Sequence, residues 1–102
     1  MTIFETLQAT GLPCAYSHFT DKHKPKKPPY LVYIGNGQDT FEADNTIYFS
    51  ENNYQIEYYF TQKNEETEAT IEETLLANGY LYDKSEDIYI EDDGVFVIYY
   101  YI

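Results

Sequence analysis

The best candidates for a metal site or a catalytic site in this sequence, by residue type and spacing, are Cys14, His18 and His23. Thiolate and imidazole are preferred zinc ligands, but the spacing C-x3-H-x4-H fits no common structural zinc site, and acidic residues would have to complete it. Cys14, His18 and Asp21 could also be placed as a nucleophilic triad, although residues this close on one strand rarely converge. We therefore expect no metal, no cofactor and no catalytic residue, and interpret Cys14 as a small buried hydrophobe.

Other motifs with chemical meaning are incomplete. Asp39, Glu42 and Asp44 lack the ligand pattern of a calcium loop. Gly35-Asn36-Gly37 is not a dinucleotide fingerprint, because no third glycine opens a helix. No serine lies in a nucleophile elbow. The sequence therefore predicts a protein that is not an enzyme.

Four of the six basic residues lie in one stretch, Lys22-His23-Lys24-Pro25-Lys26-Lys27, although the net charge is −12. Like charges repel and proline prevents regular structure, so we expect a basic, proline-rich loop over residues 20–29. One interpretation is a solvated connection between strands. The other is a contact loop that meets an acidic surface of a neighbouring subunit or partner and becomes ordered on docking. The residues that would make this contact are Lys22, Lys24, Lys26 and Lys27.

Length and composition exclude several classes of protein. A chain of 102 residues with one cysteine predicts a single domain, 1–102, without an internal disulfide. Strong acidity and the absence of arginine argue against sequence-specific nucleic-acid binding. No apolar run is long enough to span a bilayer, and the N-terminus lacks the features of a signal peptide. We therefore expect no membrane partner and an intracellular protein, or part of something assembled inside a cell.

The hydrophobic periodicity and turn signals predict an α+β fold. A capping box at Thr2 begins a short helix, and Asn64 begins a second one that closes at Asn78-Gly79. Strands are expected over residues 14–19, 30–34, 46–50, 54–61, 87–91 and 95–102, with turns at 35–37, 51–53 and 92–94. The resulting order is α-β-β-β-β-α-β-β, with a largely antiparallel or mixed sheet and two helices packed on one face.

The second predicted helix has an apolar stripe and an acidic side. Ile71, Leu75 and Leu76 form the stripe that we expect to lie on the sheet. The carboxylates are expected on the opposite, polar side: Glu66, Glu68, Glu72 and Glu73.

The last predicted strand, residues 95–102, has no polar face, whereas a strand covered on one side should alternate. It could be a central strand, with one face on the helices and the other under tyrosines and a loop. Alternatively, the second face of the sheet, or an exposed edge, meets another subunit. Under this interface hypothesis the contact residues are Phe96, Ile98, Tyr100 and Ile102. The excess of tyrosine, thirteen residues, also suits an interface.

Several segments together resemble a family of phage proteins. They are Gly11-Leu12-Pro13 after the first helix, Pro28-Pro29-Tyr30-Leu31-Val32-Tyr33, Phe41-Glu42-Ala43-Asp44-Asn45, Tyr54-Gln55-Ile56-Glu57-Tyr58-Tyr59, and Ser85-Glu86-Asp87-Ile88-Tyr89-Ile90 before the tyrosine-rich last strand. This pattern of strands, turns and aromatic residues covers nearly the whole chain. It resembles the tail-completion, or tail-terminator, proteins that join head to tail in long-tailed phages and prophages of Gram-positive bacteria.

The resemblance implies a function in assembly. Such a protein forms a ring, usually a hexamer, that caps the tail tube and docks to the head connector. Its partners would be copies of itself, the tail-tube protein and the head-tail connector. It would be assembled in the host cytoplasm and reside in the virion, at the head-proximal end of the tail.

A second hypothesis comes from the charge alone. A small acidic protein can mimic DNA by presenting carboxylates at phosphate-like spacing to a nucleic-acid-binding protein. The acidic helix over residues 65–73 would supply part of that surface. Such an inhibitor would stay a monomer or dimer, whereas a tail terminator would form rings.

Overall fold

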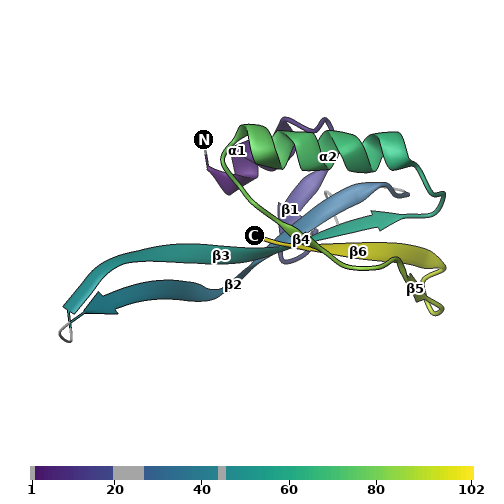
Figure 1. Cartoon of the computed structure of the whole chain (residues 1–102). Coiled ribbons are helices and arrows are strands. Elements are labelled where there is room, and N and C mark those ends of the chain that lie inside the picture. The colour runs from purple at the N-terminus through teal and green to yellow at the C-terminus, as the bar shows by residue number, and fades with distance from the viewer. Residues whose placement is uncertain (1, 20–26, 44–45) are drawn as a thin grey trace.

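The computed structural model describes residues 2–19, 27–43 and 46–102. Six strands form one mixed sheet in the order β1-β2-β3-β6-β4, with β5 also paired to β6. The β1–β2 pair is parallel and the other pairs are antiparallel. Helices α1 and α2 both lie on one side of this sheet (Figure 1). The predicted α+β class is therefore confirmed.

The elements are α1 (Ile3–Gln8), β1 (Cys14–Tyr16), β2 (Tyr30–Ala43), β3 (Thr46–Phe60), α2 (Glu65–Ala77), β4 (Asp83–Lys84), β5 (Ile88–Ile90) and β6 (Val95–Tyr101).

Local signals place the helix ends where the sequence predicts them. The Thr2 hydroxyl accepts a hydrogen bond from the Glu5 backbone N–H, and the Glu5 carboxylate accepts one from the Thr2 N–H. The Asn64 side chain accepts hydrogen bonds from two N–H groups in the first turn of α2. Gly11 and Gly79 follow the two helices with φ of +83° and +84°, a conformation that glycine adopts at little cost.

The predicted strands 46–50 and 54–61 are one continuous strand, β3, so the prediction of separate strands is wrong. Gly35-Asn36-Gly37 does not end β2 either. The register passes from Gly35 opposite Tyr54 to Gln38 opposite Asn52, so that two residues of β2 face one of β3. This is a β-bulge, which accommodates turn-forming residues inside a ladder. The observed order is accordingly α-β-β-β-α-β-β-β.

The backbones of β2 and β3 continue beyond the rest of the sheet as a two-stranded arm, hereafter the β2–β3 arm (Figure 1). With the arm, the molecule measures 51 × 27 × 25 Å along its principal axes. β1 pairs with β2 only at Leu31–Tyr33, and β6 pairs with β3 only at Gln55–Phe60. Beyond these ranges, the described backbone of the arm pairs only within the arm, β2 with β3.

The core lies between the helices and one face of the sheet. Its central residues are Ile3, Leu7, Leu31, Ile56, Tyr58, Phe60, Ile71, Leu75, Ile98 and Tyr100. Leu76 is 51% exposed, so the predicted inclusion of this residue in the buried stripe is wrong. Glu68, Ile71 and Leu75 follow one another at spacings of three and four residues, and Leu76 lies one residue further round the helix.

Candidate functional site

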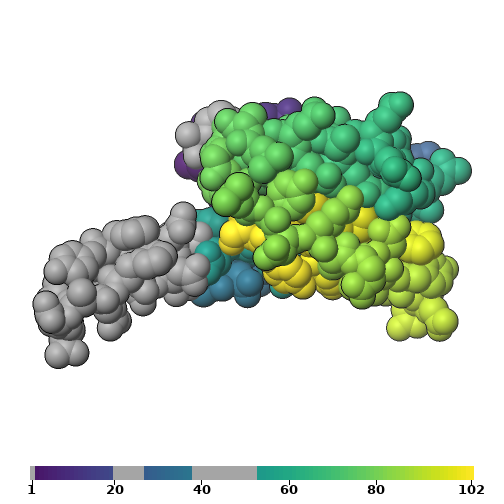
Figure 2. Space-filling model, viewed as in Figure 1, coloured from purple at the N-terminus to yellow at the C-terminus, as the bar shows by residue number. Residues whose placement is uncertain are grey.

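The residues predicted to form a subunit interface on the last strand lie instead against the chain's own helices. Ile98 and Tyr100 are fully buried in the core, and Phe96 and Ile102 are partly buried against it. β6 is a central strand, with β3 on one side and β4 and β5 on the other. Figure 2 shows the segment that follows α2 packed along β6. The choice of Ile98 and Tyr100 as interface residues is therefore corrected, because a side chain buried within its own subunit offers no surface to a second one. For the partly buried Phe96 and Ile102 an interface role stays a prediction.

The opposite face of the sheet carries no helix in the described part of the chain (Figure 1). Strand register places its members: Glu57 lies opposite Val32 and Tyr99, and Tyr59 lies opposite Tyr30 and Val97. We call this surface the open face. On β2, β3 and β6 it comprises Tyr30, Val32, Ile34, Gln55, Glu57, Tyr59, Val97, Tyr99 and Tyr101, of which Val32 and Val97 are buried. The same register adds Ala15 on β1, Asp83 on β4 and Ile88 on β5.

Four tyrosine rings lie on the open face. The Tyr30 and Tyr59 rings stack with centroids 5.2 Å apart, and Tyr99 and Tyr101 stack at 6.2 Å. Tyr101 is 39% exposed, and the other three tyrosines are half-buried. Rings held partly in contact with one another present a broad, stiff, amphipathic surface, which loses little conformational entropy when a partner covers it.

Glu57 is the charged side chain in the middle of the open face, and Asp83 is a second one at its β4 edge. It accepts a hydrogen bond from the Tyr59 hydroxyl, and Gln55 Nε2 lies 3.3 Å from its other oxygen. Burial and the bond to Glu57 raise the pKa of Tyr59, and burial together with the same carboxylate raises the pKa of Tyr99. The phenols around Glu57 therefore remain protonated donors at neutral pH. The arrangement can bind a cation or a hydrogen-bond donor.

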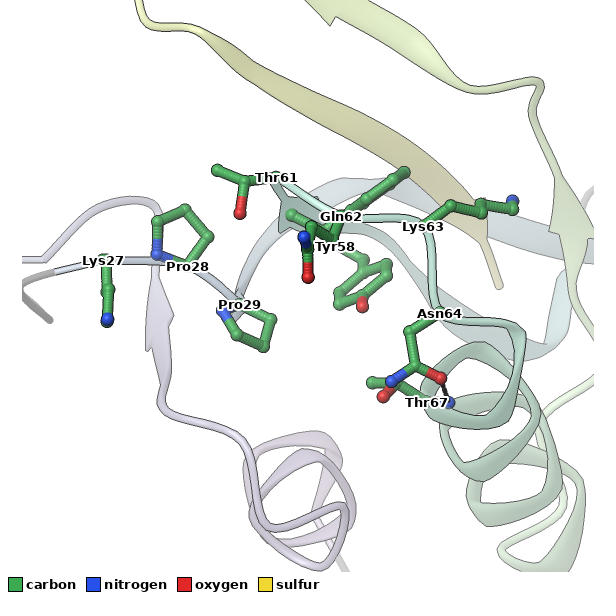
Figure 3. A pocket seen from close by; sticks show the side chains of 10 residues that line it. Lys27, Pro28, Pro29, Tyr58, Thr61, Gln62, Lys63, Asn64 and Thr67 are labelled. Carbon is green, nitrogen blue, oxygen red and sulfur yellow. Dashed lines mark hydrogen bonds between the residues drawn. The ribbon is translucent and has the colours of Figure 1, made fainter.

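The predicted contact loop falls mostly outside the described residues, which include Lys27 but not Lys22, Lys24 or Lys26. Lys27 is exposed and lines a pocket of about 330 Å³ between the start of β2, the end of β3 and the N-terminus of α2. Figure 3 shows Pro28 and Pro29 on one side of this pocket and Asn64 and Thr67 on the other. Its lining is mainly hydroxyl, amide and aromatic groups, without a grouping suited to covalent chemistry.

A second polar cluster, on the helix side, was missed by sequence reasoning. Glu68 was expected on the solvent side of α2, yet it is 2% exposed. Lys84 Nζ lies 2.9 Å from its Oε1, and Lys63 Nζ lies 2.9 Å from its Oε2. That second contact lacks hydrogen-bond geometry, so Oε2 accepts no hydrogen bond, although Lys63 does bond to Oε1 at 3.1 Å.

Glu72 extends the same cluster. Its carboxylate lies 2.8 Å from Lys84 Nζ and accepts hydrogen bonds from the Tyr100 and Tyr82 hydroxyls at 2.8 and 3.3 Å. Burial alone would raise the pKa of Glu72, but the bonds from Lys84 and Tyr100 outweigh it and lower the pKa. The cluster ties α2 to β4 and β6. The signal was available in the sequence, because Glu68 stands in the spacing of the buried stripe and Lys63 and Lys84 flank the helix.

The residues with metal-ligand chemistry do not gather. Over residues 2–19, 27–43 and 46–102, no group of three His, Cys, Asp or Glu side chains could hold a metal ion. Cys14 is half-buried in β1, where burial raises the pKa of its thiol, and His23 lies outside the described residues. His18 Nδ1 lies 3.3 Å from the Ser17 hydroxyl.

Neither described helix is long and apolar enough to cross a membrane. Comparison of the chain with models of protein families, with curated proteins and with solved structures finds no match. The open face is therefore the candidate functional site on the strength of its own geometry.

Proposed function

We propose that this protein is a non-enzymatic structural protein of a phage or prophage particle. It self-associates at the head-proximal end of the tail, completes the tail tube and joins it to the head connector. The observation that carries the proposal is the open face, a surface of tyrosine and aliphatic side chains with two carboxylates, Glu57 and Asp83, in a chain of net charge −12. Enrichment in aromatic residues and depletion of charge are the compositional marks of an interface core.

The β2–β3 arm supports the same function. A two-stranded ribbon is marginally stable in water by itself and gains stability by packing on a neighbour. Both strands of the arm also have outer edges that can pair with another chain. An elongated subunit with such an arm suits an assembly in which each copy contacts the next.

The net charge of the chain suits a channel for DNA. Carboxylates in the lumen of a ring would repel the phosphate backbone and let the genome pass without sticking. The proposal that the particle is a phage tail comes from the resemblance of the sequence to tail-completion proteins. The expected assembly is a ring of copies, which in that family is usually a hexamer.

The alternative, an acidic DNA mimic, is weakened by the position of two carboxylates. Glu68 and Glu72 lie in the predicted mimic surface, but both are engaged by lysines within the chain. A mimic needs its carboxylates free to meet the basic groove of its target. The exposed acids that α2 leaves for a target are Glu65, Glu66 and Glu73.

Electron microscopy of the protein mixed with purified phage tails tests the proposal. The expected result is ring-shaped density at the head-proximal end of the tail tube, together with joining of tails to heads. A protein that adds no density there and binds a nuclease or repressor as a monomer would establish the mimic instead. Light scattering of the free protein over a concentration series measures whether copies associate before they meet a tail.

A further inference from the structure

We propose that the β2–β3 arm of one copy pairs edge to edge with the arm of the next copy, so that β3 of the first lies beside β2 of the second. The inference rests on the proposed function, since it assumes self-association. It adds which backbone segments meet, in which direction they run, and the type of symmetry that results.

In the body of the sheet, the outer edges of β2 and β3 are covered. β1 pairs with β2 along Leu31–Tyr33. β6 pairs with β3 along Gln55–Phe60, and next to that stretch the Tyr54 and Ile102 backbones exchange hydrogen bonds of 3.2 and 3.0 Å. The strands that edge the body, β1, β4 and β5, are only two or three residues long. Short edge strands are one way in which proteins prevent pairing with other chains.

The arm has no such protection in the described part of the chain. Residues 38–43 of β2 and 46–52 of β3 pair with each other and with no other described strand (Figure 1). These two stretches contain neither lysine nor proline, which commonly protect edges. A two-stranded ribbon is marginally stable alone, and Asp39 lies directly opposite Glu51, which places like charges together. A further strand on either side would therefore stabilise the arm.

The strand register shows which backbone groups of the arm point outward. In an antiparallel ladder, the N–H and C=O groups of successive residues point alternately to the two sides of the strand. Those of Tyr54 point away from β2, because they bond to Ile102. The bulge adds its extra residue to β2, so the alternation continues unbroken along β3 from Tyr54 to Ser50. The outward residues are Ser50 and Asn52 on β3 and, opposite them, Thr40 and Gln38 on β2.

The directions of the two strands determine how copies can join. β2 and β3 run antiparallel, so a second arm that lies beside the first and points the same way places its β2 antiparallel to β3 of the first. Each contact uses one edge of each kind, and each arm supplies both kinds, so a second copy is the partner that can satisfy both edges. Such a head-to-tail contact repeats, and when the rotation closes it into a ring, every arm edge is paired. A two-fold contact between two β3 edges would leave both β2 edges bare.

Proline substitution tests this pairing, because proline lacks an N–H and is tolerated where that group points away from its own ladder. Thr40→Pro damages the β2 edge, and Ser50→Pro damages the β3 edge. The charged residues of the arm are acidic, so association is measured by sedimentation equilibrium in about 0.15 M salt, which screens their repulsion. Each variant alone should associate at least about tenfold more weakly than wild type, because every contact then includes one damaged edge.

An equimolar mixture of the two proline variants retains one intact pair of edges. It should form a heterodimer that does not grow further. Thr40→Ala and Ser50→Ala are the matched controls, because they change the same side chains and keep the N–H groups, and they should associate as wild type does.

Amide hydrogen exchange of the wild type is a second readout that needs no substitution. The assembled protein is exchanged in D₂O, and protection is read residue by residue by NMR after quenching and dissociation. The amides of the four outward residues should exchange at least about tenfold more slowly in the assembled protein than in the dilute monomer. An arm that only became more rigid would protect the inward amides, such as those of Asp39 and Glu51, and not the outward ones.

The outcomes separate the inference from the proposed function. The arm contact is wrong if the outward amides gain no protection on assembly, or if the mixed proline variants associate no better than either alone. Wild-type association of Thr40→Pro would establish a two-fold contact through β3 instead. A protein that is monomeric at millimolar concentration but adds ring density to tails would overturn the arm contact and leave the proposed function intact. Arm pairing without density on tails would do the reverse, and with neither result both are wrong.

Discussion

Removal of both lysines that contact Glu68 is expected to destabilise the protein strongly. The Glu68 side chain is 3% exposed, and the two ammonium groups at 2.9 Å balance its charge. In Lys63→Met/Lys84→Met, a carboxylate would stay buried with no cation beside it. Breaking a buried ion pair from one side costs about 3–5 kcal/mol. Because the lysines are partly exposed and water can enter where they lay, we expect the lower end of that range, about 3 kcal/mol.

The single variants should show which contact matters. Lys63 is 45% exposed and its other partner, Asp87, is 37% exposed, so that second pair is worth only about 0–1 kcal/mol. Lys63→Met alone should therefore cost about 1 kcal/mol, because Lys84 still neutralises Glu68. Adding Glu68→Met to the double variant should return part of the lost stability, since it removes the unpaired buried charge, whereas the partly exposed Glu72 stays without Lys84.

Urea unfolding at neutral pH, followed by far-UV circular dichroism, measures these differences in the free energy of unfolding. Lys27→Met, at an exposed position, is the control and should change little. The reasoning fails if the double variant loses less than about 1 kcal/mol, or if Glu68→Met makes it less stable still. Either result would mean that water, and not lysine, compensates the Glu68 charge.

Three further predictions concern the core and its pH dependence. Leu75→Ala should cost about 2–5 kcal/mol and the neighbouring Leu76→Ala under about 0.5 kcal/mol in the same unfolding assay, because only Leu75 is fully buried. Tyr100→Phe should cost about 1.5–3 kcal/mol, since it removes the 2.8 Å hydrogen bond to the Glu72 carboxylate. The lowered pKa of Glu72 means that its contribution is complete above its ordinary pKa of 4.5 and is lost as the pH falls through the lowered value. Glu72→Gln should therefore flatten the loss of stability below about pH 4.5 in a pH series, and an unchanged profile would contradict this.

Helix caps and tight turns, which depend on a few neighbouring residues, could be predicted from the sequence. The capping box at Thr2, the cap at Asn64 and the turn before Gly94 depend on local hydrogen bonds, and all three are present. The bulge in β2 was misread because Gly35-Asn36-Gly37 has the composition of a turn. Whether such residues reverse the chain or sit inside a ladder depends on the partner strand, which lies at a distance in sequence.

The orientation of β6 needed the same long-range information. Its own residues are apolar on both faces, so alternation cannot indicate which face is covered. β3 does alternate, with Ile56 and Tyr58 on one face and Glu57 on the other. Once Tyr58 is paired with Ile98, the helix side of β6 follows. Ile98 and Tyr100, chosen from the sequence as interface residues, therefore lie on the covered face, while the expectation that the second face of the sheet meets another subunit stays a proposal.

The distribution of the six lysines connects the fold to the proposed assembly. Two of them neutralise buried or half-buried carboxylates and hold α2 against the sheet, and the other four lie together in the run before β2. The rest of the sequence carries no other lysine and no arginine, so its charged side chains are acidic. Two copies of such a chain repel unless the basic run of one approaches an acidic or uncharged surface of the other. Association of copies that uses this run would therefore weaken as salt is added, because salt screens the attraction between the lysines and the carboxylates of the neighbour.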